Sequence, residues 1–196
     1  MRRRPPARAS TFTTTRRTWT RSSRPFRRRD PTLEKPFAEL DALYRDVVLD
    51  HYRSPRGREP LPAPDVQRRG FNPVCGDEVL VALAMDGDVV REVQVKSRGC
   101  AISVASGSML ADLLPGRTRG EAERLIEAFR ALLRGEEPAG DLDLGDLDAL
   151  RGVARFPVRI KCAMLPWMTL RESLRARERG GEDAQDAAAT TEEARG

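Results

Sequence analysis

Two short runs rich in β-branched residues lie near the middle of the chain and constrain its fold more than any other feature. The runs are EVLVALAM (78–85) and VVREVQVKS (89–97), and Asp86-Gly87-Asp88 separates them. An Asp-Gly pair between such runs predicts a β-hairpin, because glycine accepts the positive φ that a tight turn requires. In the second run, Val93 and Val95 mark one buried face. We therefore expect a small antiparallel sheet built around this hairpin.

Helical patterns lie on both sides of the hairpin. Apolar residues recur at three- and four-residue spacing within 36–57, which predicts a helix that ends near Ser54-Pro55. A segment rich in Pro and Arg then leads to Asn72 and is predicted to be a loop. The only histidine, His51, lies at the end of this first helix, where we expect a surface or capping residue and leave a ligand role open.

Three further helices are predicted after the hairpin. The first, SVASGSMLADLL, ends at Pro115-Gly116, and the second begins at Thr118, where Glu121 three residues later completes a capping box. An acidic stretch punctuated by Pro and Gly follows, and a last helix starts at about Lys161. Together with the hairpin these patterns predict an α+β domain.

Charge and composition divide the chain into three parts. Residues 1–35 hold twelve basic and two acidic residues, a net +10, so the rest carries −5 of the total +5. We expect a disordered Arg-rich arm over 1–35, a folded domain over 36–178 and a disordered acidic tail over 179–196. A phosphate-binding arm and an organelle transit peptide remain alternatives for residues 1–35. Because the folded part is not basic, the overall charge does not indicate nucleic-acid binding.

Cysteine usage and hydropathy indicate a compartment. The chain has three cysteines and no apolar segment at its start, which favours a reducing environment over a secreted disulfide scaffold. The longest apolar run, Val79–Met85, is far too short to span a bilayer. We expect a cytoplasmic protein that does not insert into membranes.

Each cysteine lies at a predicted junction. Cys75, in NPVCGDEV, precedes the hairpin two residues before Asp77, Cys100 follows the hairpin, and Cys162 opens the last helix. The two outer ends of a hairpin lie side by side, so Cys75 and Cys100 can converge, whereas Cys162 must be delivered by tertiary folding. Thiolates that converge need a cation, and a tetrahedral Zn²⁺ accepts Cys and Asp ligands. Cys75, Asp77, Cys100 and Cys162 would fill its coordination shell.

The spacing alone leaves a structural interpretation open. The chain has no CxxC pair, Asp77 suits a turn, and Cys100 could be a small core residue. If a metal binds, Arg159 and Lys161 would offset part of the negative charge of the ligands. The start of a helix near Cys162 would also lower the pKa of that thiol.

Four segments of the chain together resemble the IscU/NifU-N-like family of iron–sulfur cluster assembly proteins. They are LYRDVVLDHYRSPRG, NPVCGDEV, GCAISVASGSML and LGDLDALRGVARFPVRIKCAMLPW, which occur in order between about Leu40 and Arg175. The resemblance is to the SufU branch, because Lys161 precedes the third cysteine where scaffold-type IscU proteins have histidine. The acidic stretch between the second and third cysteines also resembles SufU-like chains. The fold implied is α+β, with a small antiparallel sheet of about three strands and helices on one face.

The resemblance also implies a function. Cys75, Asp77, Cys100 and Cys162 would bind zinc, and the protein would act as a sulfurtransferase in the SUF system. Cys75 would accept persulfide sulfur from a PLP-dependent cysteine desulfurase of the SufS type, upstream of other SUF cluster-assembly proteins. Cys75 is the expected acceptor because it lies on the most exposed turn, framed by Pro and Gly.

Two other functions remain open from the sequence. The first is a scaffold that assembles and hands on a [2Fe–2S] cluster, since three thiolates and an aspartate could hold iron as well as zinc. The second is a structural zinc module whose Arg-rich arm binds DNA or RNA. It predicts salt-dependent binding that is lost when residues 1–35 are removed.

Overall fold

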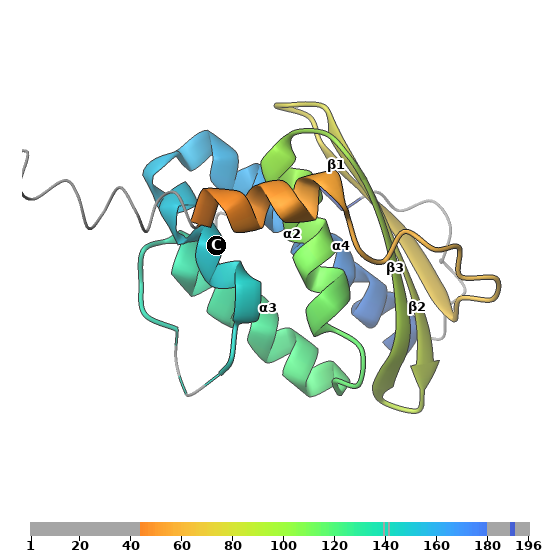
Figure 1. The fold of residues 1–196 in the computed structure, drawn as a ribbon. Helices are drawn as coiled ribbons and strands as arrows, with labels where there is room; N and C mark the ends of the chain where they lie inside the picture. The colour runs from red at the N-terminus through yellow and green to blue at the C-terminus, as the bar shows by residue number, and fades with distance from the viewer. Residues whose placement is uncertain (1–43, 139, 141, 180–188, 191–196) are drawn as a thin grey trace, which may run out of the picture.

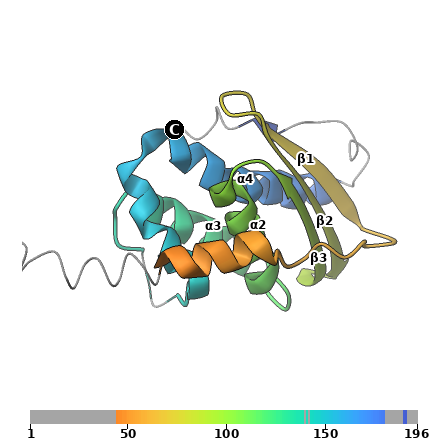
Figure 2. The same ribbon diagram turned by 45° about the horizontal axis from the view of Figure 1, so that its top comes forward.

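Three long antiparallel strands form the sheet on which the domain is built. The computed structural model describes residues 44–138, 140 and 142–179 and the backbone of 189–190. The strands are β1 (Val66–Asn72), β2 (Asp77–Asp86) and β3 (Val89–Arg98), and a short β4 (Ala189–Thr190) pairs in parallel with β1. The sheet order is β3-β2-β1-β4. Figures 1 and 2 show that the helices gather on one face of this sheet, which confirms the α+β class.

The helices have the following bounds. Residues 44–53 are helical, and they are followed after β3 by α2 (Ala101–Leu113), α3 (Arg119–Leu133), the 3₁₀ helix η1 (Gly145–Arg155) and α4 (Pro157–Glu178). Among the residues described, no helix combines the length and the apolar character needed to cross a bilayer. The predicted arm over 1–35 lies outside the described residues, as does nearly all of the tail predicted over 179–196. The domain boundaries therefore stay predictions.

The hairpin of β2 and β3 is confirmed. The strands pair antiparallel from Glu78↔Arg98 to Asp86↔Val89, with a register shift between Ala84 and Met85. Gly87 has φ +59°, the left-handed conformation that the Asp-Gly signal indicates.

Strand β1 lies where the sequence predicts only a loop, and that prediction is wrong. Its inward-facing residues are Val66, Arg68, Gly70 and Asn72, all of them buried. Three of these four are polar or lack a side chain, so the strand shows no apolar alternation in the sequence. β1 is nevertheless held by a continuous antiparallel register with β2, from Val66↔Leu83 to Asn72↔Asp77.

The core lies between the sheet and helices α2 and α4. Trp167 is fully buried and donates its indole N–H to Ser106 Oγ of α2 at 3.0 Å. Its ring packs in a tilted arrangement against Phe129 of α3, with 5.2 Å between the ring centroids. Helix α2 approaches β3 so closely that a Cβ on Gly107 would lie 2.5 Å from Ser97 Oγ. The small-residue composition of α2 thus permits close packing of this helix on the sheet.

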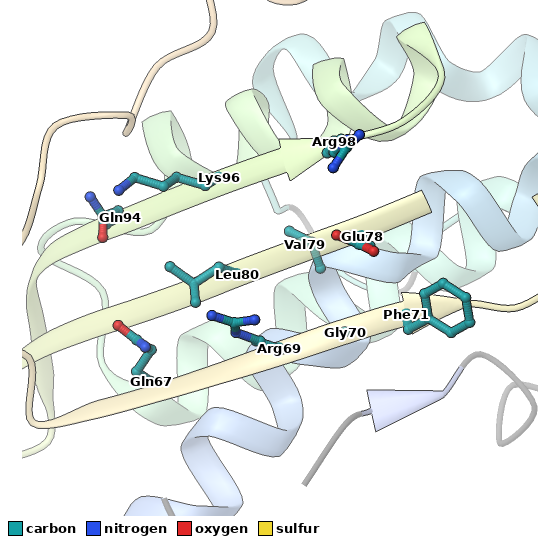
Figure 3. Close-up of a pocket in the computed structure, with 10 residues that line it drawn as sticks. All are labelled: Gln67, Arg69, Gly70, Phe71, Glu78, Val79, Leu80, Gln94, Lys96 and Arg98. Carbon is teal, nitrogen blue, oxygen red and sulfur yellow. The ribbon is translucent and has the colours of Figure 1, made fainter. Parts of the chain in front are cut away.

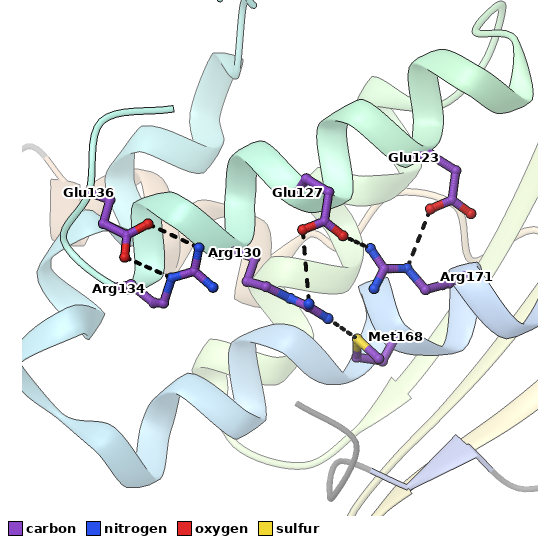
Figure 4. Close-up of polar contacts among 7 residues, drawn as sticks. All are labelled: Glu123, Glu127, Arg130, Arg134, Glu136, Met168 and Arg171. Atoms are coloured by element: carbon purple, nitrogen blue, oxygen red, sulfur yellow. Dashed lines mark hydrogen bonds and ion pairs between the residues drawn. The ribbon is translucent and has the colours of Figure 1, made fainter. Parts of the chain in front are cut away.

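Ion pairs between side chains of α3 and α4 join these two helices (Figure 4). Arg171, almost fully buried, pairs with Glu123 at 3.4 Å and with Glu127. Arg130 lies within 3.9 Å of Glu127 and donates to Met168 Sδ at 3.4 Å. These contacts fix α4, the helix that carries Cys162, relative to α3.

The start of α3 agrees with the prediction from the sequence, whereas the start of α4 does not. The capping box of α3 is formed as predicted, with the side chains of Thr118 and Glu121 each accepting from the other's backbone N–H. Helix α4, by contrast, begins at Pro157 and not at about Lys161, so that prediction is wrong. Proline at the first position has a φ already suited to a helix and lacks only an N–H that would be unpaired there.

His51 is buried, which corrects the expectation of a surface or capping residue. Its ring is fully excluded from solvent, with Nδ1 at 2.8 Å from Ser108 Oγ and Nε2 at 2.9 Å from Asp146 Oδ2. The ring therefore joins the helix over 44–53 to α2 and η1.

Candidate metal and sulfur site

Cys75 lies on the tight loop that joins β1 to β2. The loop closes between Asn72 and Asp77, which face each other in the strand register. Gly76 has φ +72° and donates its backbone N–H to the Asn72 carbonyl at 2.8 Å. The side chain of Cys75 is exposed. The Pro/Gly-framed turn thus presents a thiol to solvent at the end of the sheet.

Cys162 reaches this loop from α4. The residue is only 1 % exposed, and its Sγ lies 3.3 Å from Cys75 Sγ. The potential ligand atoms of Cys75, Asp77 and Cys162 all lie within 4.8 Å of one another. Folding therefore brings together residues that are 87 positions apart in the chain.

Cys100 lies beside this group but outside it. Asp77 is 2 % exposed, and its carboxylate accepts the Cys100 backbone N–H at 3.0 Å through Oδ1. The Cys100 Sγ lies 3.7 Å from Asp77 Oδ2. Cys100 is also the N-terminal cap of α2, and its side chain makes no capping hydrogen bond. The structure thus brings three of the four predicted ligands into one cluster, with the fourth in contact with Asp77.

These separations lie within about 0.5 Å of those around a tetrahedral zinc ion. With Zn–S of about 2.3 Å and Zn–O of about 2.1 Å, two sulfurs would be about 3.8 Å apart and a sulfur and an oxygen about 3.6 Å apart. The observed Cys75–Cys162 and Cys100–Asp77 separations are 3.3 Å and 3.7 Å. A donor set of soft thiolates with one carboxylate suits zinc or iron, and not magnesium or calcium.

Burial favours the protonated form of two thiols in the metal-free chain. Burial raises the pKa of Cys75, and it raises the pKa of Cys162 well above the ordinary range, helped by hydrogen bonding to Cys75. The expectation that a helix N-terminus lowers the pKa of Cys162 is therefore wrong. Cys162 is the sixth residue of α4, not its first, and burial outweighs the helix dipole.

Arg159 lies beside the thiols, and three exposed apolar residues lie near Cys75 or Cys162 in the chain. The pKa of Arg159 is raised, first by a hydrogen bond to Cys100, so this cation stands beside the site as the sequence analysis expects. Val74, Phe156 and Val158 are each 60 to 62 % exposed. Val74 is adjacent to Cys75, and the Val158 carbonyl lies 3.9 Å from Cys162 Sγ. Exposed apolar residues thus precede Cys75 and begin the helix that carries Cys162, and a cation lies beside Cys100.

A separate groove of about 620 Å³ lies on the outer face of the sheet (Figure 3). Arg69 of β1 and Lys96 and Arg98 of β3 line it, together with seven other residues. None of the four predicted ligands is among the residues that line it. This groove and the thiol site are therefore distinct features of the described surface.

Two residues at the site were missed by the sequence analysis. Asn72 contacts both the Cys75 loop and Cys162, and Gly99 leaves space for Asp77. The motif NPVCGD contains Asn72, but its contact with Cys162 spans 90 positions and depends on tertiary folding.

Comparison with known proteins places this arrangement in a family. The profile of the NifU-like N terminal domain matches residues 43–163, which contain all four predicted ligands. The chain belongs to the NifU-like N-terminal domain family. The resemblance to the IscU/NifU-N group is thereby confirmed.

Relatives within this family carry two kinds of name. Zinc-dependent sulfurtransferase SufU of Bacillus subtilis strain 168 is 40 % identical over 144 residues, covering 74 % of this chain and 97 % of the relative. Iron–sulfur cluster assembly scaffold protein IscU of Streptococcus pyogenes serotype M1 is 35 % identical over 138 residues, covering 70 % and 86 %.

Solved structures support the fold. A candidate iron–sulfur cluster assembly scaffold protein for the SUF system from Fervidobacterium islandicum AW-1 superposes with a TM-score of 0.61 at 29 % identity, covering 66 % of this chain and 94 % of that one. The N-terminal part of a NifU-like protein from Brucella abortus gives a TM-score of 0.65 at 24 % identity, covering 71 % and 97 %, and supports the fold alone.

Proposed function

We propose that this protein is a zinc-dependent sulfurtransferase of iron–sulfur cluster assembly, with Cys75 as the sulfur acceptor. The observation that carries the proposal is the exposed Cys75 thiol at 3.3 Å from a buried cysteine and within 4.8 Å of a buried carboxylate. The 40 % identity to a zinc-dependent sulfurtransferase, over almost the whole of that relative, supports it. Cys75, Asp77, Cys100 and Cys162 are the proposed ligands.

The four side chains would have different tasks. Zinc, when bound, would keep its thiol ligands deprotonated at neutral pH, and it would thereby oppose the burial that raises the pKa of Cys75 and Cys162. Cys162 and Asp77 are buried and would anchor the site, whereas Cys75 is exposed and can meet an incoming group. Arg159 would stabilise the surplus negative charge next to Cys100.

The proposed donor is the persulfide of a PLP-dependent cysteine desulfurase of the SufS type. The Cys75 thiolate attacks the outer sulfur, and a new sulfur–sulfur bond forms on Cys75. The persulfide bond of the desulfurase breaks, and its electron pair leaves with the desulfurase cysteine as a thiolate. No external oxidant or reductant is needed. Other cluster-assembly proteins of the SUF system would then receive the sulfur.

Exposed apolar residues near the two cysteines support docking of another protein at this point. Val74 precedes Cys75, Phe156 and Val158 lie at the start of the helix that carries Cys162, and exposed apolar surface is typical of interaction sites. A docked desulfurase would also exclude water from the persulfide during transfer.

The test is a cysteine desulfurase assay with the full-length chain, run beside its zinc content. We expect Cys75→Ala to reduce stimulation of the desulfurase to the rate of the desulfurase alone, and mass spectrometry to find the added sulfur on Cys75 of the parent chain. Undiminished stimulation by Cys75→Ala would move the acceptor role to another cysteine.

A second candidate function is scaffolding of a [2Fe–2S] cluster, which the similarity to the IscU scaffold of Streptococcus pyogenes favours. Metal analysis separates the two functions. One colourless zinc per chain supports sulfur transfer. A brown protein that absorbs visible light after reconstitution with iron and sulfide supports scaffolding.

A further inference from the structure

Asn72 contacts two separate parts of the thiol site with one buried side chain. The residue ends β1 and is 1 % exposed. Its Oδ1 accepts the Val74 backbone N–H at 3.1 Å, and its Nδ2 lies 3.9 Å from Cys162 Sγ, a long hydrogen bond to sulfur. Its backbone carbonyl accepts the Gly76 N–H. Asn72 therefore contacts the residues on each side of Cys75 as well as the sulfur of Cys162.

These contacts fix the orientation of the amide. A backbone N–H can only donate, so the atom that faces Val74 must be the oxygen. The amide nitrogen then faces Cys162 and can only donate to its sulfur. A side chain that holds the Cys75 loop at one end and donates to Cys162 at the other sets the distance between the two sulfurs.

We propose that Asn72 is a positioning residue of the site, which holds Cys75 against Cys162 and donates an N–H to the Cys162 thiolate in the metal-bound protein. This inference rests on the proposed function for its metal-bound half. Three thiolates and one carboxylate give a divalent site a surplus negative charge. A neutral donor beside one sulfur reduces that charge without competing for the metal. Partners of this outer kind typically alter metal affinity by about 10- to 100-fold when removed.

Two substitutions of Asn72 distinguish its role as a donor to Cys162 from its role as an acceptor in the turn. Asn72→Asp keeps the shape and the oxygen that accepts from Val74, but replaces the N–H donor by an acceptor. Asn72→Ser keeps a short acceptor suited to the turn and cannot reach Cys162. Gln94→Glu is the matched control, because Gln94 is also a buried amide on the sheet, 4 % exposed, and donates only to the carbonyls of Arg58 and Glu59.

The experiment measures zinc affinity of the full-length chains by competition with a chromogenic chelator, and the absorption of their Co²⁺ forms. We expect both Asn72 variants to lose about 10- to 100-fold in zinc affinity. We also expect their sulfur-to-cobalt charge-transfer band to move to longer wavelength, because a thiolate without its donor is more electron-rich. Gln94→Glu should lower the melting temperature and change neither reading. Asn72 variants that are folded, bind zinc within about threefold of the parent and give the parent's cobalt spectrum would overturn the proposal.

Disulfide formation in the metal-free chain tests the positioning role of Asn72 separately from the proposed function. In the metal-free parent, mild oxidation by diamide should couple Cys75 to Cys162, the pair whose sulfurs are 3.3 Å apart. Two thiols lose their protons and two electrons to diamide as the disulfide forms. Asn72→Ser should lose this preference and give disulfides that include Cys100. If the parent bound neither zinc nor cobalt, the proposed function would fail. The disulfides formed with diamide would then decide the positioning role alone. The same disulfides in Asn72→Ser as in the parent would reject that role.

Discussion

Gly99 has no side chain at a position where Asp77 occupies the neighbouring space. A Cβ on Gly99 would collide with the carboxylate of Asp77, while its φ is not in the positive range that restricts other residues. The collision alone therefore excludes a side chain. The Asp77 carboxylate, for which Gly99 leaves space, also accepts the Cys100 backbone N–H at 3.0 Å.

We expect Gly99→Ala to push Asp77 out of place and lower zinc affinity by about 10- to 100-fold. Chelator competition on the purified chain measures the change. Gly120→Ala is the control, because no atom lies within 4 Å of the position of its Cβ. Equal zinc affinity of the Gly99→Ala chain and the parent would show that Asp77 is not held by this contact.

The raised pKa values of Cys75 and Cys162 predict how the metal-free chain responds to pH. A thiol whose pKa is higher in the folded chain than in the unfolded chain stabilises the fold at pH values below its unfolded pKa. This contribution is lost as the pH rises above the unfolded pKa. The free energy of unfolding of the metal-free chain should therefore fall between about pH 7.5 and about pH 9.5, since an unfolded thiol titrates near 8.5. Urea titrations at the two pH values measure it. Cys162→Ser should show a smaller decrease, and an increase in the parent would contradict the assigned direction.

At the scale of residues, the sequence indicates candidate ligands but not what holds them. Four ligands are expected from the positions of the cysteines, and the structure gathers Cys75, Asp77 and Cys162 into one cluster while Cys100 lies outside it. Asn72 and Gly99 could not be found in this way, because their roles depend on atoms brought close by tertiary folding.

At the scale of elements, the capping box of α3 offers a local test of stability. Thr118 Oγ1 accepts the Glu121 backbone N–H at 3.3 Å, and Glu121 Oε2 accepts the Thr118 N–H at 2.7 Å. Thr118→Ala should lower the free energy of unfolding by about 1 kcal/mol, whereas Thr118→Ser should keep most of it. Urea denaturation compares the two variants. Equal loss in both would mean that the hydroxyl is not the stabilising group.

Elements with a local signal were predictable, and those defined by tertiary packing were not. The hairpin of β2 and β3 carries its own turn chemistry at Gly87, and α3 carries its own cap. β1 has neither, because Arg68, Gly70 and Asn72 occupy its inward face. Gly70 faces α4 so closely that a Cβ would collide with Thr169, and this requirement for a small residue cannot be read from β1 alone.

At the scale of the whole molecule, His51 joins three helical segments through Ser108 and Asp146. His51→Leu should lower the free energy of unfolding by about 2 kcal/mol, because two hydrogen bonds of a buried ring are lost. Tyr52→Leu, at a neighbouring position that is 45 % exposed, should change it by less than about 0.5 kcal/mol. Urea unfolding measures both, with zinc content as a second reading. Loss of zinc at unchanged stability would instead support the ligand role that the sequence left open.

Cys75 and Cys162 differ in how much the fold covers them. Cys162 belongs to a 22-residue helix whose middle is wedged into the core, so its sulfur cannot travel without disrupting Trp167 and its neighbours. Cys75 stands on a short loop outside the core, where Asn72 holds the backbone on both sides and the thiol faces solvent. The two sulfurs therefore differ in access, because a group added to Cys75 would face outward, whereas Cys162 stays covered by its own helix and the core.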